Sequence, residues 1–415
     1  MRIAVIGSGI SGLTAAYLLS RRHEVAVFEA NDYIGGHTHT VPVKTEDEEH
    51  AVDTGFIVFN ERNYPNFTRL LALLGVPSQP TSMSFSVRSD RSGLEYNGTS
   101  INRLFVQRSN LLKPSFHRMV RDILRFNREA EETVLGMADD MTVRQFVEQH
   151  GYSNEFAEQY LIPLGASLWS SPARIFRRFP IRFVVEFLAN HSMLQANGRP
   201  TWRVVRGGSW KYVEKLTAPF RDRVRLQCPV HAVERRPDGV QVAYQGGSES
   251  FDEVVFSCHS DQALRMLRAD SSPQERTLLQ AFPYQANAAV LHTDPSVLPK
   301  RRKAWASWNY HVPEHDRDSV SVTYNMNILQ SLRSSSVFNV TLNETDSIAP
   351  ERVLGRYSYE HPVFTSSRSA AQQRHGEVIR NNRTSFCGAY WGYGFHEDGV
   401  RTALAVGAAY GEVLS

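Results

Sequence analysis

Near its N-terminus the chain reads Arg2-Ile-Ala-Val-Ile-Gly7-Ser-Gly9-Ile-Ser11-Gly12-Leu-Thr-Ala-Ala-Tyr-Leu-Leu19. The apolar run from Ile3 to Ile6 predicts a buried parallel strand, and the apolar residues from Leu13 onward predict a helix. The glycines between them permit a tight turn, close approach of the backbone to a pyrophosphate, and close packing of helix on strand. The helix N-terminus would offer free N–H groups to the phosphates. The stretch therefore predicts a dinucleotide site that includes Gly7, Gly9, Ser11 and Gly12.

An acidic residue follows where a nucleotide site needs one. The apolar stretch Glu24-Val-Ala-Val-Phe-Glu29 predicts a second strand that ends in Glu29. An acid about 20 residues after the glycines can accept a hydrogen bond from a ribose hydroxyl, and it argues against a 2′-phosphate. Strand, glycines, helix and acid together favour a nucleotide site over a glycine turn without a ligand.

A second glycine pair, Gly35-Gly36, points to the kind of dinucleotide. Asp53-Thr-Gly55-Phe56 lies beyond the pair. This arrangement resembles FAD proteins of the amine oxidase and phytoene desaturase superfamily, although these normally have Arg after the pair where this chain has His37-Thr38-His39. A phosphate or flavin contact, ordinary loop filling and metal binding stay open for His37, but no Cys or acid cluster joins the two histidines. We expect no metal, and we expect FAD to contact Gly35, Gly36, His37, Thr38, Gly55 and Phe56.

Length and composition predict more than one core. The chain has 415 residues, of which 41% are hydrophobic, and a formal charge of +3, which makes nucleic acid an unlikely main partner. Three scattered cysteines (Cys228, Cys258 and Cys387) fit neither a disulfide framework nor a zinc site, and they indicate a reducing compartment. The predicted strand at Arg2 leaves no room for a signal peptide, and no apolar run reaches the roughly 18 residues of a membrane span. We therefore expect a cytoplasmic protein, with peripheral contact at the inner face of the membrane left open.

The expected fold class is α/β, with a Rossmann-type FAD-binding domain interleaved with a mixed α+β substrate-binding domain. The FAD-binding domain is expected over residues 1–80, 200–270 and 381–415, and the substrate-binding domain over 81–199 and 271–380. Helices are predicted near 115–135 and 142–150, and strands at Gly239–Tyr244, Phe251–Ser257 and Asn287–His292. Val230, which precedes the first of these strands, is included among the cofactor-binding residues.

A second glycine-rich stretch lies near the C-terminus. It reads Phe386-Cys-Gly388-Ala-Tyr-Trp391-Gly-Tyr393-Gly-Phe-His396-Glu397-Asp398-Gly399-Val400 and leads into a predicted helix from Gly399 to Val413. The N-terminus of that helix would lie beside the pyrimidine edge of the flavin and stabilise negative charge on the reduced ring. We accordingly expect Gly388, Asp398, Gly399 and Val400 at the cofactor.

Several stretches together resemble the N-terminal flavoprotein region of plant cyclopropane fatty acid synthases, and equally the stand-alone bacterial flavoproteins that accompany cyclopropane-synthase-like methyltransferases. They are the glycine-rich stretch from Phe386, Gly35-Gly-His-Thr, Val52-Asp-Thr-Gly-Phe-Ile-Val-Phe-Asn60, Ser82-Met-Ser-Phe-Ser-Val87 and Val205-Arg-Gly-Gly-Ser209. The resemblance implies an amine-oxidase-like fold and a non-covalently held FAD. It also implies work on lipid acyl chains, including desaturation of methylated acyl groups on the way to furan fatty acids, and a methyltransferase as partner.

Amine oxidases usually carry a lysine on the substrate-domain strand that faces the flavin. The matching stretch here, Phe282–His292, contains no lysine, which counts against amine chemistry. The aromatic pair of amine oxidases has no clear counterpart, but Trp391 and Tyr393 are candidates for walls of the substrate space or for packing beside the ring. Trp308 and Tyr310 lie on a predicted strand and are candidates for the same space or for the core.

Desaturation requires a base near its operating pH. His396 is the first candidate, because an unshifted histidine titrates near neutrality, and Glu397 is the second. The alternative is that Glu397 and Asp398 only cap the last helix, where acidic residues are favoured.

Two basic stretches are candidates for contact with a membrane. Residues 172–183 mix Arg174, Arg177, Arg178 and Arg182 with large apolar residues, as interfacial segments do. A second stripe contains Arg118, Arg121, Arg125 and Arg128 at helical spacing, which equally fits a solvated helix face. Three functions remain: an FAD-dependent desaturase of acyl chains, an amine or polyene oxidoreductase, and a non-catalytic flavoprotein partner of a methyltransferase.

Overall fold

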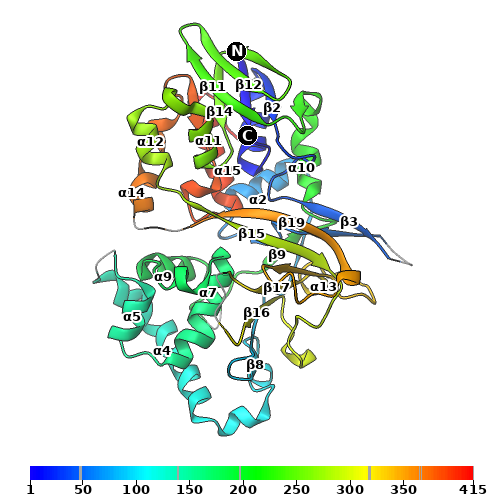
Figure 1. The fold of residues 1–415 in the computed structure, drawn as a ribbon, viewed down its shortest axis with the longest axis vertical. Helices are drawn as coiled ribbons and strands as arrows, with labels where there is room; N and C mark the ends of the chain where they lie inside the picture. The colour runs from blue at the N-terminus through cyan, green and yellow to red at the C-terminus, as the bar shows by residue number, and fades with distance from the viewer. Residues whose placement is uncertain are drawn as a thin grey trace.

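The computed structural model of the protein describes residues 1–45, 49–137, 140–195, 198–315, 319–363, 365 and 367–414. Figure 1 shows both termini in one half of the molecule and a largely helical part in the other half. Strands β15 (Tyr284–His292) and β19 (Val353–Pro362) run between the two halves.

The first half is built on a parallel sheet of five strands in the order β10-β2-β1-β14-β20. The strands are β1 (Arg2–Ile6), β2 (Glu24–Phe28), β10 (Val224–Arg225), β14 (Glu253–Phe256) and β20 (Thr384–Phe386). β14 and β20 join the sheet from far along the chain, and β14 pairs directly with β1. This sheet confirms the expected α/β class with an interleaved nucleotide-binding part.

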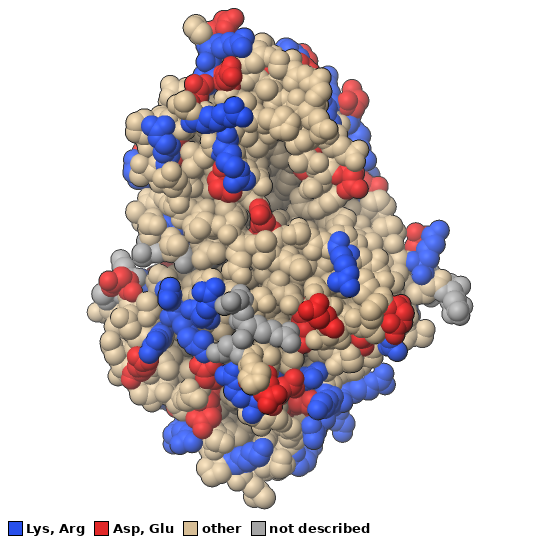
Figure 2. All heavy atoms as spheres, in the orientation of Figure 1, with Lys and Arg blue, Asp and Glu red and all other residues tan. Residues whose placement is uncertain are grey.

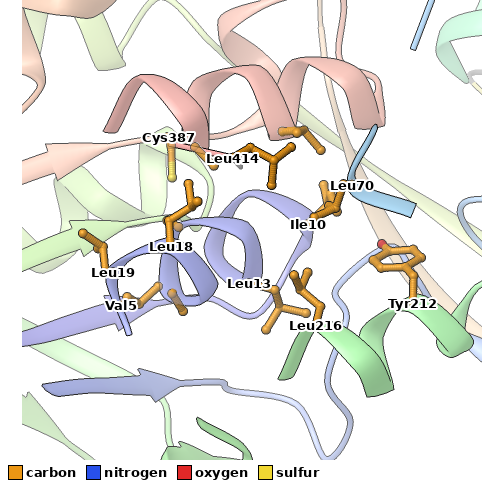
Figure 3. Packing of buried hydrophobic residues seen from close by; sticks show 14 of the residues in the cluster. Val5, Ile10, Leu13, Leu18, Leu19, Leu70, Tyr212, Leu216, Cys387 and Leu414 are labelled. Carbon is orange, nitrogen blue, oxygen red and sulfur yellow. The ribbon is translucent and has the colours of Figure 1, made fainter. Parts of the chain in front are cut away.

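Helix α1 (Ile10–Leu19) lies in the core of this half. It is apolar on all sides, which is typical of a buried helix, and nine of its ten residues are buried. Figure 3 shows side chains of α1 packed between those of the C-terminal helix α15 (His396–Ala409) and α10 (Trp210–Thr217). α15 begins three residues before the expected start because the Asp398 carboxylate accepts the Phe395 N–H and caps the helix there.

The other face of the parallel sheet is covered by a second layer. Its elements are β11 (Val230–Arg236), β12 (Gly239–Tyr244), β13 (Gly247–Phe251), α11 (Ser260–Leu267), α12 (Pro273–Leu279) and α14 (Ser367–Gln373). Leu278 of α12 and Ala371 of α14 share one apolar cluster with Ile6 and Phe28. Both helices were expected in the substrate-binding domain, and the packing instead places them with the nucleotide-binding sheet.

A seven-stranded sheet forms the base of the other half, in the order β19-β15-β18-β17-β16-β7-β8. Its remaining strands are β7 (Phe85–Ser89), β8 (Leu94–Asn97), β16 (Trp308–Val312), β17 (Val322–Asn325) and β18 (Asn339–Leu342). A hairpin of β3 (Thr40–Lys44) and β4 (Glu49–Asp53) and a small sheet of β5 (Phe59–Asn60), β9 (Trp202–Val205) and β6 (Ser78–Pro80) connect the halves.

Helices α4 (Pro114–Leu135), α5 (Val143–Gln149), α7 (Ile162–Trp169) and α9 (Ile181–Asn190) complete this half around an aromatic core. α8 (Ala173–Phe176) lies in the segment 172–183 that was expected to be interfacial. Phe176, Phe179 and Ile181 are fully buried in the helical core, and Arg177 forms an ion pair of 2.7 Å with Glu158. The segment therefore offers no exposed apolar strip, because its large side chains fill the core. In the part of the chain that the structure describes, no helix combines the length and apolarity needed to cross a bilayer.

Candidate active site

One cavity of about 1660 Å³ connects the two halves. Its wall starts at the glycines before α1, passes the second glycine pair, and ends among side chains of α4 and α7. Figure 2 shows a hollow in the upper half of the molecule. The volume exceeds the roughly 300–1,000 Å³ of an ordinary ligand pocket, so it has room for a dinucleotide and a second ligand.

The nucleotide end is shaped by the glycines and by Glu29. Gly7 has a φ of +102°, which a side chain rarely permits, and it forms the turn between β1 and α1. Ser8 donates to Glu29 Oε2 from its N–H (2.9 Å) and from its hydroxyl (2.6 Å), and Asn31 N–H donates to Oε1 (2.9 Å). Glu29 is thus held in the cavity wall, where its carboxylate can also accept from a ribose hydroxyl. Gly7, Gly9, Ser11, Gly35, Gly36 and Val230 line the same end, while Gly12 packs against Gly7 behind it.

His396 lies at the start of α15 and contacts Phe56, Thr38 and Tyr212. Its ring stacks on Phe56 at a centroid distance of 3.4 Å, and Nε2 lies 3.0 Å from both the Thr38 and the Tyr212 hydroxyl oxygens. Burial holds the pKa of His396 well below its usual value, so the ring is neutral. Since Nε2 is already paired with two hydroxyl groups, this geometry does not support the predicted role of His396 as a base. His396 instead forms part of the cavity wall together with Phe56 and His37.

Glu397 holds two helices together. Its carboxylate accepts from Asn66 Nδ2 (2.6 Å), Asn66 N–H (3.2 Å) and Phe67 N–H (3.0 Å), which caps the N-terminus of α2 (Pro65–Leu73). Burial raises the pKa of Glu397 and that of Asp398. Neither carboxylate lines the cavity, and the same holds for Gly399 and Val400. The structure therefore does not support Glu397 as a base. Asp398 caps the last helix, which is the alternative that the sequence left open, whereas Glu397 caps α2 instead.

The four predicted substrate-binding aromatics divide into two pairs. Trp308 and Tyr393 line the cavity, and so does Gly388, which was predicted to contact the cofactor. Tyr310 lies two residues farther along β16 and is buried in a cluster with Phe116, beyond the cavity wall. Trp391 packs on Phe282 at 5.0 Å and His375 at 4.6 Å, in the layer behind the parallel sheet. Tyr310 and Trp391 are thus core residues.

β19 contributes residues that the sequence analysis missed. Tyr357, Tyr359 and His361 alternate along this strand, and period-two spacing puts them on one face. Tyr359 and His361 line the cavity, whereas Tyr357 does not. The His37 ring lies 5.3 Å from Tyr359 and 5.2 Å from His361, and its own pKa is lowered to about 3, chiefly by burial. The alternation Tyr-x-Tyr-x-His, which is typical of a strand, was the available signal.

A chain of amides sets the protonation state of His361. Ala288 N–H donates to Asn343 Oδ1 (2.9 Å), Asn343 Nδ2 donates to Asn287 Oδ1 (2.7 Å), and Asn287 Nδ2 lies 2.9 Å from His361 Nδ1. Because a backbone N–H can only donate, Asn343 Oδ1 is the acceptor at the first contact, and Asn343 then donates to Asn287 through its Nδ2 group. Asn287 in turn donates to His361 through its own Nδ2 group, so His361 Nδ1 is an acceptor without a proton. His361 therefore carries its proton on Nε2 and presents a donor, and burial lowers its pKa to about 4.

Replacing Asn287 by Asp should reverse this assignment. A carboxylate accepts where the amide donates, so Nδ1 takes up a proton and the His361 imidazolium is stabilised. We expect His361 to titrate near neutrality in the Asn287→Asp variant and to stay neutral down to about pH 5 in the unaltered protein. Side-chain nitrogen NMR of histidine across this pH range measures both the tautomer and the titration, and an unchanged titration would contradict the amide chain.

The far end of the cavity is apolar. Its wall includes Phe85, Tyr96, Val120, Ile123, Leu164 and Leu168. Across the wall formed by residues 81–202, the described residues contribute one formally charged side chain, Arg199, and no carboxylate. This end suits a long hydrocarbon group better than a cationic one.

Fold and cavity define a two-domain protein with a nucleotide-binding half and a second half that lines the rest of the cavity. The glycine turn, the fixed Glu29 and the helix N-terminus fit the adenosine and pyrophosphate of FAD. The chain belongs to the family of flavin-containing amine oxidoreductases, whose family model matches residues 10–335. FAD is the cofactor of this family and of this chain.

Individual relatives are distant. Amine oxidase [flavin-containing] A of Sus scrofa is 23% identical over 270 residues, which cover 62% of this chain and 48% of the relative. The chain spans about half the length of the curated relatives it matches first.

Solved structures match over nearly the whole chain. Cyclohexylamine oxidase from Brevibacterium oxydans IH-35A superposes with a TM-score of 0.70 at 16% identity and covers 98% of both chains. The CLA-producing fatty acid isomerase from P. acnes superposes with a TM-score of 0.65 at 14% identity and covers 97% of this chain and 96% of its own. At such identity the likeness shows the two-domain fold alone.

Proposed function

We propose that the protein is an FAD-dependent desaturase that acts on a methylated or unsaturated fatty acyl chain. The apolar end of the cavity, with its carboxylate-free wall, carries this proposal, because a polyamine would leave its ammonium groups without partners there. The fatty acid isomerase of the same fold supports it as a protein whose named substrate is an acyl chain.

In the proposed reaction a hydride leaves one carbon of the acyl chain and a proton passes from its neighbour to a base of the cavity wall, so that a double bond forms between them. The Glu360 carboxylate, which lines the cavity, would accept this proton. Bound FAD supplies the two-electron acceptor. The chain's own residues position the acyl group along Val120, Leu164 and Leu168 and exclude water from the reacting carbons. Arg199, at the edge of this wall, would pair with the anionic head of a fatty acid or phospholipid.

An anaerobic titration tests the function. Purified holoprotein is mixed with methyl-branched unsaturated acyl lipids, and loss of the flavin's visible absorbance is followed together with the mass of the lipid. We expect bleaching and a loss of two hydrogen atoms from one lipid. The Val120→Trp variant fills the apolar end, so we expect at least a tenfold slower bleaching by lipid while reduction by dithionite is unchanged.

The same titration separates the alternatives. Bleaching by an amine and not by any lipid would favour an amine oxidoreductase, as the family membership allows. No reduction by either class, together with co-purification of a cyclopropane-synthase-like methyltransferase, would favour a non-catalytic flavoprotein partner.

A further inference from the structure

Four large apolar side chains lie uncovered on one surface at the end of the substrate-binding half. The exposed fractions are 88% for Leu112, 79% for Ile101, 62% for Leu124 and 50% for Leu111. They belong to α3 (Ile101–Leu104), to the short helix Arg108–Leu112 and to α4. We call this region the α3–α4 surface.

Local hydrogen bonds make the α3–α4 surface one continuous structure. The Arg108 guanidinium donates to Asn102 Oδ1 (2.5 Å), which ties the short helix to α3. The His117 ring lies 2.8 Å from the Leu111 carbonyl oxygen, which ties the short helix to α4. His117 and Leu124 are seven residues apart on α4 and therefore share a face of that helix.

The surface is basic as well as apolar. Arg103, Arg108, Lys113 and Arg121 are exposed on it, and among the described residues no carboxylate comes within ion-pairing distance of these four cations. Figure 2 shows Lys and Arg side chains gathered around the lower end of the molecule, where Figure 1 places the segment that leads into α4. Exposed leucines among unpaired cations match the interior and the head groups of an anionic bilayer.

The cavity reaches this same surface. Thr99, Leu104 and Val120 line it between α3 and α4, and Leu124 both lines it and is exposed. A hydrocarbon chain entering beside Leu124 would thus pass from the surface to the apolar end without crossing water.

We propose that the α3–α4 surface docks on an anionic lipid bilayer and that the acyl substrate enters the cavity between α3 and α4. The proposal rests on the proposed function for the nature of the substrate. It replaces the segment 172–183 as the site of membrane contact, and it retains Arg121 of the basic stripe on α4.

Sedimentation of the holoprotein with vesicles tests the surface. We expect binding to vesicles that contain one third phosphatidylglycerol and much weaker binding to pure phosphatidylcholine. The Leu111→Ser/Leu112→Ser variant should bind anionic vesicles at least tenfold more weakly, since both leucines lose their transfer from water. In the Lys113→Glu/Arg121→Glu variant, the affinity for anionic vesicles should fall about fivefold or more for each replaced charge, while binding to pure phosphatidylcholine should not change. Leu135→Ser is the matched control, because Leu135 is 70% exposed at the opposite end of the same helix.

The proposal that the α3–α4 surface docks on a bilayer would be overturned by either of two results. One is wild-type protein that stays in the supernatant with anionic vesicles, and the other is variants that bind as tightly as the Leu135→Ser control. Reduction of the flavin by a free acyl chain without vesicles tests the proposed function separately. The Leu111→Ser/Leu112→Ser variant should keep that rate and be slowed only with vesicle-embedded lipid. If the protein binds vesicles through this surface but no acyl chain reduces the flavin, the docking proposal is supported and the proposed function is refuted.

Discussion

Between pH 7 and pH 5 the free energy of unfolding is expected to fall by several kcal/mol. Five histidines are held neutral in the folded protein: burial lowers the pKa of His37 to about 3 and those of His191, His292, His361 and His375 to about 4. In the unfolded chain each of them titrates near 6.5. The unfolded state therefore binds more protons throughout this range.

The sign follows from linkage. Because the folded pKa values are lowered, the stabilising contribution is complete above about pH 6.5 and is lost as the pH falls toward 4. Each ring contributes about 1.4 kcal/mol per pH unit, against a total stability of about 5–15 kcal/mol for a typical protein. Asp53, Glu397, Asp398 and His311 act in the opposite direction, because the pKa of each is raised in the folded protein, that of Asp53 to about 7, and they offset part of this fall.

Chemical denaturation at half-unit steps from pH 7.5 to pH 5 measures this slope. Burial is the main reason that the five rings resist protonation. At His292 the Asp294 N–H also donates to Nδ1 (3.0 Å), so that nitrogen has no room for a proton. His292→Gln should reduce the slope by one proton, whereas His315→Gln, at an exposed position, should leave it unchanged. An unfolding free energy that does not change between pH 7 and pH 5.5 would contradict the prediction that these five histidines are neutral in the folded protein.

Substitution of Gly12 by Ala should abolish FAD binding. A Cβ at this position would overlap the carbonyl oxygen of Gly7, which belongs to the turn between β1 and α1. Helix and strand would have to separate, and this moves both the helix N-terminus and the Gly7 turn away from the pyrophosphate. We expect at least a hundredfold loss of FAD affinity together with a lower melting temperature of the apoprotein.

Gly9→Ala separates binding from folding. No atom of the described structure lies within 4 Å of a Cβ built there, so the apoprotein should melt as before. The methyl group would occupy the space that the pyrophosphate approaches, and we expect at least a tenfold loss of affinity. Gly376→Ala, which also has open space around it, should change neither property. FAD titration by fluorescence and melting of the apoprotein are the two readouts. If Gly9→Ala binds FAD with full affinity, the pyrophosphate does not approach the backbone at Gly9.

The nucleotide end was predictable because its determinants are local. Strand, glycine turn, helix and acid lie within the first 29 residues, and each is recognised by spacing and residue type alone. The cap of α15 is local as well, because the Asp398 carboxylate accepts the N–H of Phe395 three residues earlier. The roles of individual residues were less predictable. Glu397 and His396 are two of a run of polar residues, and only the approach of α2 and Tyr212 shows that their polar atoms are already paired.

The amino-acid sequence alone determined the fold class, FAD as the cofactor and the return of the chain to the first sheet, since local patterns and apolar runs encode them. Only the tertiary structure decided which aromatic residues face the cavity and which are core. Trp308 and Tyr310 share a strand face, but only Trp308 lines the cavity, because Phe116 of α4 packs in one cluster with Tyr310. The tertiary structure likewise joined His361 to Asn287 and opened the cavity beside Leu124, because both depend on segments that are distant in sequence and meet only through packing.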